Sequence, residues 1–157
     1  MVMPRCQGHR PAMAQQRGSS LIEIAVVLGV IGIALGIAVP GFRHALDAYG
    51  AAAGRDTIIA LAARARSLAI AHGGADLIID ADSGLARIET RDTAPEVFAL
   101  GDRFGVRLTI ENSSRPTVIV RYDGIGLGRL ANLRLLVERG DAQARVVFSM
   151  YGRARRG

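Results

Sequence analysis

The longest apolar stretch of the chain lies near its beginning, where sixteen uncharged residues occupy positions 24–39. A single carboxylate, Glu23, comes directly before them. A helix needs about 20 apolar residues to cross a bilayer, so the segment 21–39 is long enough only if Glu23 lies near the membrane surface. The pattern predicts a membrane-spanning helix over residues 19–40 with one acidic side chain close to its start.

A second helical pattern follows this segment. Residues recur at steps of three and four on one face, at Ile58, Leu61, Ala65, Leu68 and His72, while the charged residues between them fall on other faces. The Pro-Gly pair at 40–41 is expected to kink the helix without ending it. The Gly-Gly pair at 73–74 is expected to end it. Together the two patterns predict one long bent helix, whose second half, residues 41–74, packs on a domain.

After residue 74 the hydrophobic pattern changes to a period of two, which is typical of strands with one buried face. The clearest alternating sets are Phe104, Val106, Leu108 and Ile110; Val118, Val120 and Tyr122; Leu133, Leu135 and Val137; and Val146, Phe148 and Met150. Weaker strands are predicted over 76–81 and 85–90, and turn-forming residues separate the strands. A helix followed by short strands predicts an α+β fold with a mostly antiparallel sheet in residues 75–151.

Small residues follow one face of the predicted membrane segment. They are Ala25, Gly29, Gly32 and Gly36, at steps of four, three and four. Gly32 and Gly36 form a GxxxG pair, which permits close approach of two helices. This face either packs against another helix or consists of glycines that lipid tolerates, and only Glu23 separates these interpretations.

Glu23 needs a partner, because a carboxylate at membrane depth costs about a few kcal/mol. Cleavage after Gly18 would create an amino group at Ser19, which could pair with Glu23 of a neighbouring copy and set the register of subunits. Two other interpretations remain: a plain anchor with Glu23 among the headgroups, and a secretory signal cut after Gly36. The mass of the mature protein distinguishes the two cleavage sites, because a cut after Gly18 keeps the apolar helix and a cut after Gly36 removes it.

Residues 17–23, Arg-Gly-Ser-Ser-Leu-Ile-Glu, precede the apolar run directly. This stretch resembles the cleavage and methylation signal of type IV prepilins and type II secretion pseudopilins, although Ser19 stands where Phe or Met is usual. The resemblance implies that a prepilin peptidase removes a leader, residues 1–18, by cutting after Gly18 and methylates the amino group of Ser19. Pro40 also stands where pilin helices commonly carry a kinking proline.

The formal charge of +6 comes from 20 basic and 14 acidic residues, and every basic residue is an arginine. Three arginines lie in residues 1–18, which contain no acid, and this bias favours a cytoplasmic amino end with the rest of the chain outside the inner membrane. The remaining +3 equals the three arginines of residues 153–156. The body of the chain is therefore about neutral, and its arginine content alone does not predict an anionic partner.

No pattern predicts catalysis, a cofactor or a metal site. The glycine-rich stretch 123–128 lies between predicted strands and lacks the helix that follows a phosphate-binding loop. His44 and His72 have no nucleophile motif nearby, and the Asp-Ala-Asp at 80–82 is interpreted as a solvated turn. Cys6 lies in the leader, so the mature chain has no thiol for a disulfide or a zinc site. We predict a protein that is not an enzyme.

The chain ends in a basic segment, residues 152–157, which starts with Gly-Arg-Ala-Arg. Arginine side chains match phosphate oxygens bidentately, and Tyr151 beside them could stack on a base. The motif and the order of helix and strands resemble the FimT/GspH group of pilins, in which some FimT-type members bind DNA during uptake through Gly-Arg-x-Arg. The resemblance implies Arg153 and Arg155 as contacts, and we predict Arg156, which is adjacent to the motif but outside its pattern, as a third.

These observations predict a minor type IV pilin of the FimT/GspH kind. It would be stored in the inner membrane with a periplasmic domain, join other pilins through its helix, and bind DNA without sequence preference during natural transformation. One alternative is a pseudopilin of a type II secretion system, in which the tail has no nucleic-acid role. Another is a membrane-anchored periplasmic binding domain that never polymerises, which an uncut leader beside an active prepilin peptidase would favour.

Overall fold

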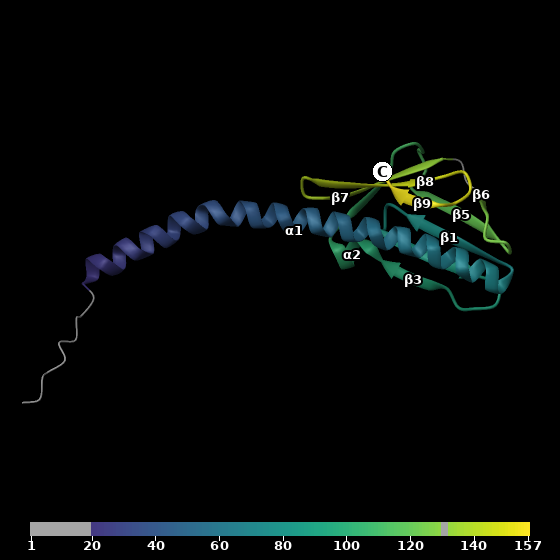
Figure 1. The fold of residues 1–157 in the computed structure, drawn as a ribbon, viewed down its shortest axis with the longest axis horizontal. Coiled ribbons are helices and arrows are strands. Elements are labelled where there is room, and N and C mark those ends of the chain that lie inside the picture. Colours follow the sequence, from purple (N-terminus) through teal and green to yellow (C-terminus); the bar gives the residue numbers. More distant parts are fainter. Residues whose placement is uncertain (1–19, 130–131) are drawn as a thin grey trace, which may run out of the picture. The chain divides into compact units, whose positions relative to one another are not determined.

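The structure is a computed structural model that describes residues 20–129 and 132–157. Figure 1 shows a long helix followed by a strand-rich part. The helices are α1 (Leu21–His72) and α2 (Leu100–Phe104), and the strands are β1 (Gly74–Asp80), β2 (Leu85–Thr90), β3 (Glu96–Ala99), β4 (Arg107–Ile110), β5 (Thr117–Asp123), β6 (Gly128–Arg129), β7 (Leu133–Arg139), β8 (Ala142–Phe148) and β9 (Ala154–Arg156). The predicted α+β architecture, a long helix packed on an antiparallel β domain, is confirmed.

Helix α1 begins directly after Ser20. The hydroxyl oxygen of Ser20 accepts a hydrogen bond from the backbone N–H of Glu23 at 3.3 Å, as a serine at a helix N-cap does. The helix continues through Pro40 and ends at His72, where Gly73 has a φ of 76° that favours glycine. Both the continuation through the proline and the stop at the glycine pair agree with the sequence pattern.

The contacts within the chain divide it into two units, with the boundary between Ala38 and Val39. In the first unit every described side chain is exposed. By length and composition α1 is able to cross a membrane, and its apolar window carries no buried residue. The predicted membrane segment is therefore a helix whose apolar surface nothing in the described chain covers.

The strands of the second unit form two antiparallel sheets. One sheet has five strands in the order β3-β2-β1-β5-β6, and the other has four in the order β4-β7-β8-β9. β1 pairs with β5 although three strands lie between them in the chain, and this pairing brings Ala75 opposite Tyr122. Buried and exposed residues alternate along the longer strands, as the period of two predicts.

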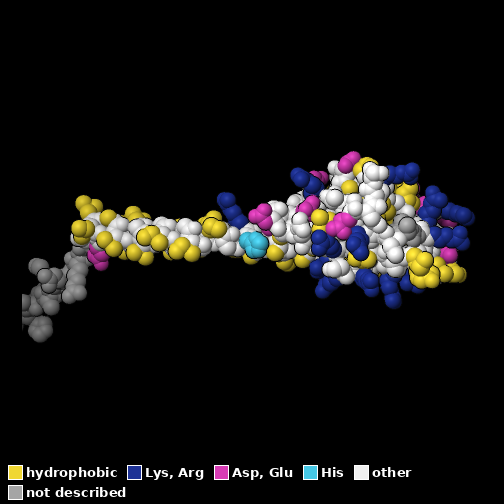
Figure 2. Space-filling model, turned by 90° about the horizontal axis from the view of Figure 1, so that it is seen from above, with side chains coloured by type: hydrophobic (Ala, Val, Ile, Leu, Met, Phe, Trp, Pro, Cys, Tyr) yellow, Lys and Arg dark blue, Asp and Glu magenta, His cyan; other side chains and the backbone are white. Residues whose placement is uncertain are grey.

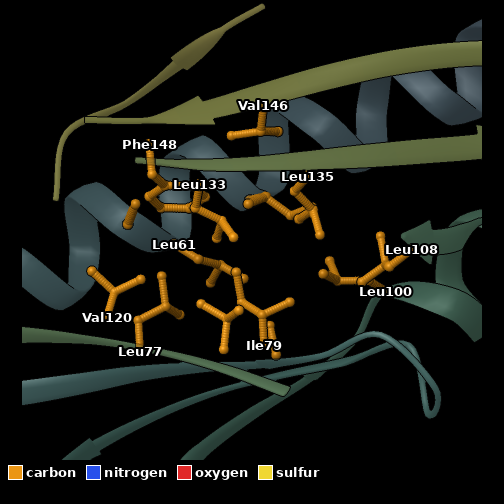
Figure 3. Packing of buried hydrophobic residues seen from close by; sticks show 14 of the residues in the cluster. Leu61, Leu77, Ile79, Leu100, Leu108, Val120, Leu133, Leu135, Val146 and Phe148 are labelled. Carbon is orange, nitrogen blue, oxygen red and sulfur yellow. The ribbon is translucent and has the colours of Figure 1, made fainter. Parts of the chain in front are cut away.

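The core lies between α1 and the inner faces of both sheets. Figure 3 shows Leu61 of α1 among residues of the five-stranded sheet (Leu77, Ile79 and Val120) and of the four-stranded sheet (Leu133, Leu135, Val146 and Phe148). The predicted helix face is confirmed at Ile58, Leu61 and Ala65, which are all buried. Gly54 allows α1 to approach β7, because an added Cβ would lie 3.1 Å from Val137 Cγ1. Each large side chain buried here contributes about 1.5–3 kcal/mol to folding.

The predicted strand over 104–110 is wrong at its start. Residues Leu100–Phe104 form α2, and β4 begins only at Arg107. Gly105 ends α2 with a φ of 63°, and the Leu100 side chain is 1% exposed. Burial of Leu100 stabilises this short helix. The sequence pattern does not reveal it, because Phe104 at its end fits the alternation of the strand that follows.

The last predicted strand also ends earlier than expected. Met150 is predicted on its buried face, but β8 stops at Phe148 and Met150 lies in the turn before β9 with 58% of its surface exposed. Strands β3, β6 and β9 have four, two and three residues, which is too short for a period of two to appear. The segment 152–157, expected as a tail, therefore contains a strand whose formation depends on its neighbour β8.

Candidate nucleic-acid interface

The basic residues of the C terminus lie on β9, at the edge of the four-stranded sheet. In chain order, Ala154, Arg155 and Arg156 pair with Phe148, Val147 and Val146 of β8. The β8 partners of Ala154 and Arg156 are fully buried, so these two residues lie on the core side of the sheet. Arg155 lies on the other side. The strand period therefore separates Arg155, and Arg153 two residues earlier, from Arg156.

Two glycines bring the segment before β9 against the start of β6. An added Cβ on Gly152 would lie 2.8 Å from the Gly128 Cα, and one on Gly128 would lie 2.5 Å from the Gly152 Cα. Gly152 also has a φ of 73°, which side chains disfavour. Gly128 donates its backbone N–H to the carbonyl oxygen of Tyr151 at 3.0 Å. The glycine of the Gly-Arg-Ala-Arg segment therefore permits a contact between two backbones that a Cβ would prevent.

Tyr122 fixes the same junction from the five-stranded sheet. Its hydroxyl donates a hydrogen bond to the carbonyl oxygen of Gly152 at 2.6 Å, and the residue is 3% exposed. Burial raises the pKa of Tyr122 to about 12, although the charge of the nearby Arg66 acts in the opposite direction. The hydroxyl therefore keeps its proton well into the alkaline range and remains a hydrogen-bond donor to the C-terminal segment.

An open cavity of about 490 Å³ lies beside this junction. Its lining consists of Arg66, Leu127, Ser149, Tyr151, Arg153 and Arg155. Arg153 and Arg155, the predicted DNA contacts, thus lie together, and α1 adds Arg66 to them. The helical period shows only that Arg66 lies off the buried face of α1, so no local signal could place it beside the C terminus.

The three arginines of the cavity lack an acidic partner within the described ranges 20–129 and 132–157. Several other arginines of the domain form ion pairs with carboxylates. Arg64 binds Glu96 through two hydrogen bonds of 2.6 and 2.7 Å, for example. Three guanidinium groups around one cavity produce a local positive potential that attracts anions, although the body of the chain is about neutral.

Arg156, the third predicted DNA contact, forms an ion pair with α1. Its Nε and Nη2 atoms lie 3.2 and 3.0 Å from the two carboxylate oxygens of Asp56. Hydrogen bonding from Arg55 and the charges of Arg55 and Arg156 hold the pKa of Asp56 below its usual value, against the effect of burial. Arg156 thus connects β9 to the helix, and its contact with DNA stays a prediction.

Replacing Asp56 with asparagine is expected to lower the melting temperature near pH 7 but not near pH 2. The folded pKa lies below the unfolded one, so the stabilisation is present above about pH 4 and is lost as the pH falls through the folded value. The pair is partly exposed, so we expect an effect below about 1 kcal/mol. Thermal unfolding of both proteins at the two pH values measures it. A difference of the same size at both would contradict the ionic origin.

Comparison with known proteins assigns the chain to a family. Over 152 residues it is 30% identical to the pilin-like protein PilA1 of Thermus thermophilus, and the match covers 89% of this chain and 97% of PilA1. The chain belongs to the type IV pilin family. No family model and no solved structure matches it.

The predicted processing site of this pilin, Gly18 and Ser19, lies outside the described residues. Glu23 lies in the first turn of α1, where it is exposed. Across residues 20–129 and 132–157 its carboxylate forms no ion pair. Pairing of Glu23 with the amino terminus of a second copy therefore stays a prediction.

Two aspartates, Asp123 in the glycine-rich stretch and Asp80 in the Asp-Ala-Asp sequence, stabilise turns of the pilin. The carboxylate of Asp123 accepts hydrogen bonds from the backbone N–H groups of Ile125 and Leu127 at 3.2 and 2.8 Å. This loop connects β5 to β6, as predicted for the glycine-rich stretch. Asp80 accepts a hydrogen bond from the Ser83 hydroxyl at 2.7 Å in the β1–β2 turn. In the part of the chain that the structure describes, no group of three side chains is placed to bind a metal.

Proposed function

We propose that the protein is a minor type IV pilin of the FimT kind that binds DNA through Arg153 and Arg155. A prepilin peptidase cuts after Gly18 and methylates Ser19, and the apolar part of α1 holds the pilin in the inner membrane with its domain in the periplasm. On assembly, α1 packs against other pilins. Membership of the pilin family, the apolar helix and the signal before it support this sequence of events.

The DNA-binding part of the proposal rests on the cavity in which Arg66, Arg153 and Arg155 lie without acidic partners. Guanidinium groups bind phosphate oxygens through two parallel hydrogen bonds. Contacts to phosphates carry no sequence information, so the expected binding is independent of base sequence. Strand β9 and the Gly152 junction hold the arginines in place before DNA arrives, which reduces the entropy that binding costs.

The test compares two double variants of the full chain in detergent micelles. Arg153→Gln with Arg155→Gln removes both proposed contacts. The control, Arg107→Gln with Arg115→Gln, removes two exposed arginines that line a different cavity. That cavity lies near the start of β5, whereas the proposed site lies next to the loop that follows the end of β5. Both variants lose the same charge, so a difference between them reports the position of the arginines.

Titration of a labelled duplex by fluorescence anisotropy gives the affinities. With Arg66 of the same cavity as a third phosphate contact beside Arg153 and Arg155, we expect weak binding with a log–log salt slope of roughly −2 to −3. The variant at Arg153 and Arg155 is expected to bind at least about tenfold more weakly with a slope near −1, and the control within about twofold of wild type. Equal losses in both variants, or no loss in either, would contradict binding through Arg153 and Arg155, and no measurable binding by wild type would agree with the pseudopilin alternative.

A further inference from the structure

The cavity with the three arginines borders an exposed apolar surface. Ile125, Leu127, Met150 and Tyr151 are 71, 41, 58 and 64% exposed. They come from the β5–β6 loop and from the turn after β8, which the hydrogen bond between Gly128 and Tyr151 holds together. Figure 2 shows hydrophobic side chains next to basic ones at the right-hand end of the globular unit. Phosphate binding needs the arginines but gives no reason for this apolar surface.

We propose that this site prefers single-stranded DNA, with an unpaired base against Tyr151 and Leu127 and the adjoining phosphates on Arg66, Arg153 and Arg155. The inference rests on the proposed function and specifies the form of DNA that the site takes.

The chemistry of the two forms of DNA favours the single strand. A duplex turns its phosphates outward and stacks its bases inside, so exposed apolar loops beside the arginines would meet only charged backbone. An unpaired strand offers base faces, and a basic groove with an aromatic side chain is the common arrangement of proteins that bind single strands.

Arg66 provides a contact that the C-terminal motif does not contain. It lies on α1, whereas Arg153 and Arg155 belong to the C-terminal segment, so a strand in the cavity meets guanidinium groups from two separate parts of the chain. The β5–β6 loop packs against the Arg66 side chain. An added Cβ on Gly126 of this loop would lie 3.1 Å from the Cγ and Nε atoms of Arg66. This packing limits the rotamers of Arg66 and holds its charge at the cavity.

The experiment titrates the full chain in micelles with a labelled oligo-dT of about 20 nucleotides and, separately, with a labelled duplex of the same length. We expect wild type to bind the single strand at least about fivefold more tightly. Tyr151→Ala removes the stacking surface and is expected to weaken single-strand binding about tenfold while duplex binding changes less than about twofold. Tyr49→Ala is the matched control, because Tyr49 is also exposed but lies on α1, away from the cavity lining. It should change neither single-strand binding nor duplex binding.

A second pair of variants tests Arg66 in the same way. Arg66→Gln is expected to weaken single-strand binding several-fold, whereas Arg115→Gln, with the same change of charge, should have little effect. Equal wild-type affinity for the two forms, or equal losses on both in Tyr151→Ala, would overturn the inference. If duplex binding still depends on Arg153 and Arg155, the proposed function survives that result. If neither form depends on these arginines, both proposals fail.

Discussion

Replacing Glu23 with alanine is expected to abolish incorporation of this pilin into filaments and to leave its insertion into the membrane intact. Glu23 is the only charged residue between Ser20 and Val39 and is exposed on α1. At membrane depth its carboxylate costs about a few kcal/mol. The pairing that we expect with the amino group of Ser19 in a neighbouring subunit would offset this cost only in the assembled filament. Removal of the charge should therefore make insertion easier and remove the contact that we expect to set subunit register.

Sheared filaments and membrane fractions from cells with wild type or Glu23→Ala, compared by immunoblot, measure this effect. Glu23→Gln is the matched control, because it removes the charge of Glu23 but keeps a side chain that suits the first turn of the helix. The backbone of Glu23 bonds to Ser20, and glutamine suits this position of a capped helix as well as glutamate does. Normal filaments with Glu23→Gln but not with Glu23→Ala would assign the residue to capping. Normal amounts of the alanine variant in filaments would refute a role in assembly.

Replacing Gly128 with alanine is expected to separate the C-terminal segment from the start of β6. The new Cβ would lie 2.5 Å from the Gly152 Cα and 3.0 Å from the Tyr151 carbonyl oxygen, and both are backbone atoms that cannot rotate away. Separation breaks the hydrogen bond from Gly128 and strains the one that Tyr122 donates to Gly152. Steric strain and lost hydrogen bonds together predict a loss of about 2–4 kcal/mol of stability.

Denaturant unfolding and DNA titration of Gly128→Ala measure both consequences. All three arginines of the cavity remain, yet we expect DNA affinity to fall about as far as in Arg153→Gln with Arg155→Gln. Gly41→Ala is the control, because an added Cβ there meets nothing within 4 Å. Tyr122→Phe removes one hydrogen bond without a clash and should cost about 1–3 kcal/mol. Wild-type DNA affinity in Gly128→Ala would show that the junction does not position the arginines.

Local periodicity accounts for the parts of the fold that the sequence predicts. The repeat of three and four places Ile58, Leu61 and Ala65 in the core, and the repeat of two finds the longer strands. The same rule fails over 104–110, because burial of Leu100 forms the short helix α2. It cannot detect strands of two to four residues such as β6, which exist only through pairing with a longer neighbour.

In the candidate site, too, some features can be predicted from the sequence and others only from the tertiary structure. The Gly-Arg-Ala-Arg segment is visible in the sequence, and so is the aromatic residue before it. The position of Arg66 beside this segment is not visible, and neither is the ion pair between Arg156 and Asp56, because each joins residues far apart in the chain. The alternation of side chains along β9 separates Arg156 from Arg153 and Arg155 only once that strand is known.

The sequence by itself determined the apolar helix and the α+β class, and it carries the resemblance to a prepilin signal before that helix, since each depends on residues close together in the chain. The tertiary structure decided which arginines surround one cavity and which is neutralised by a carboxylate. Such contacts follow from the pairing of β8 with β9 and from the packing of both sheets on α1, and these arrangements leave no periodic trace in the sequence.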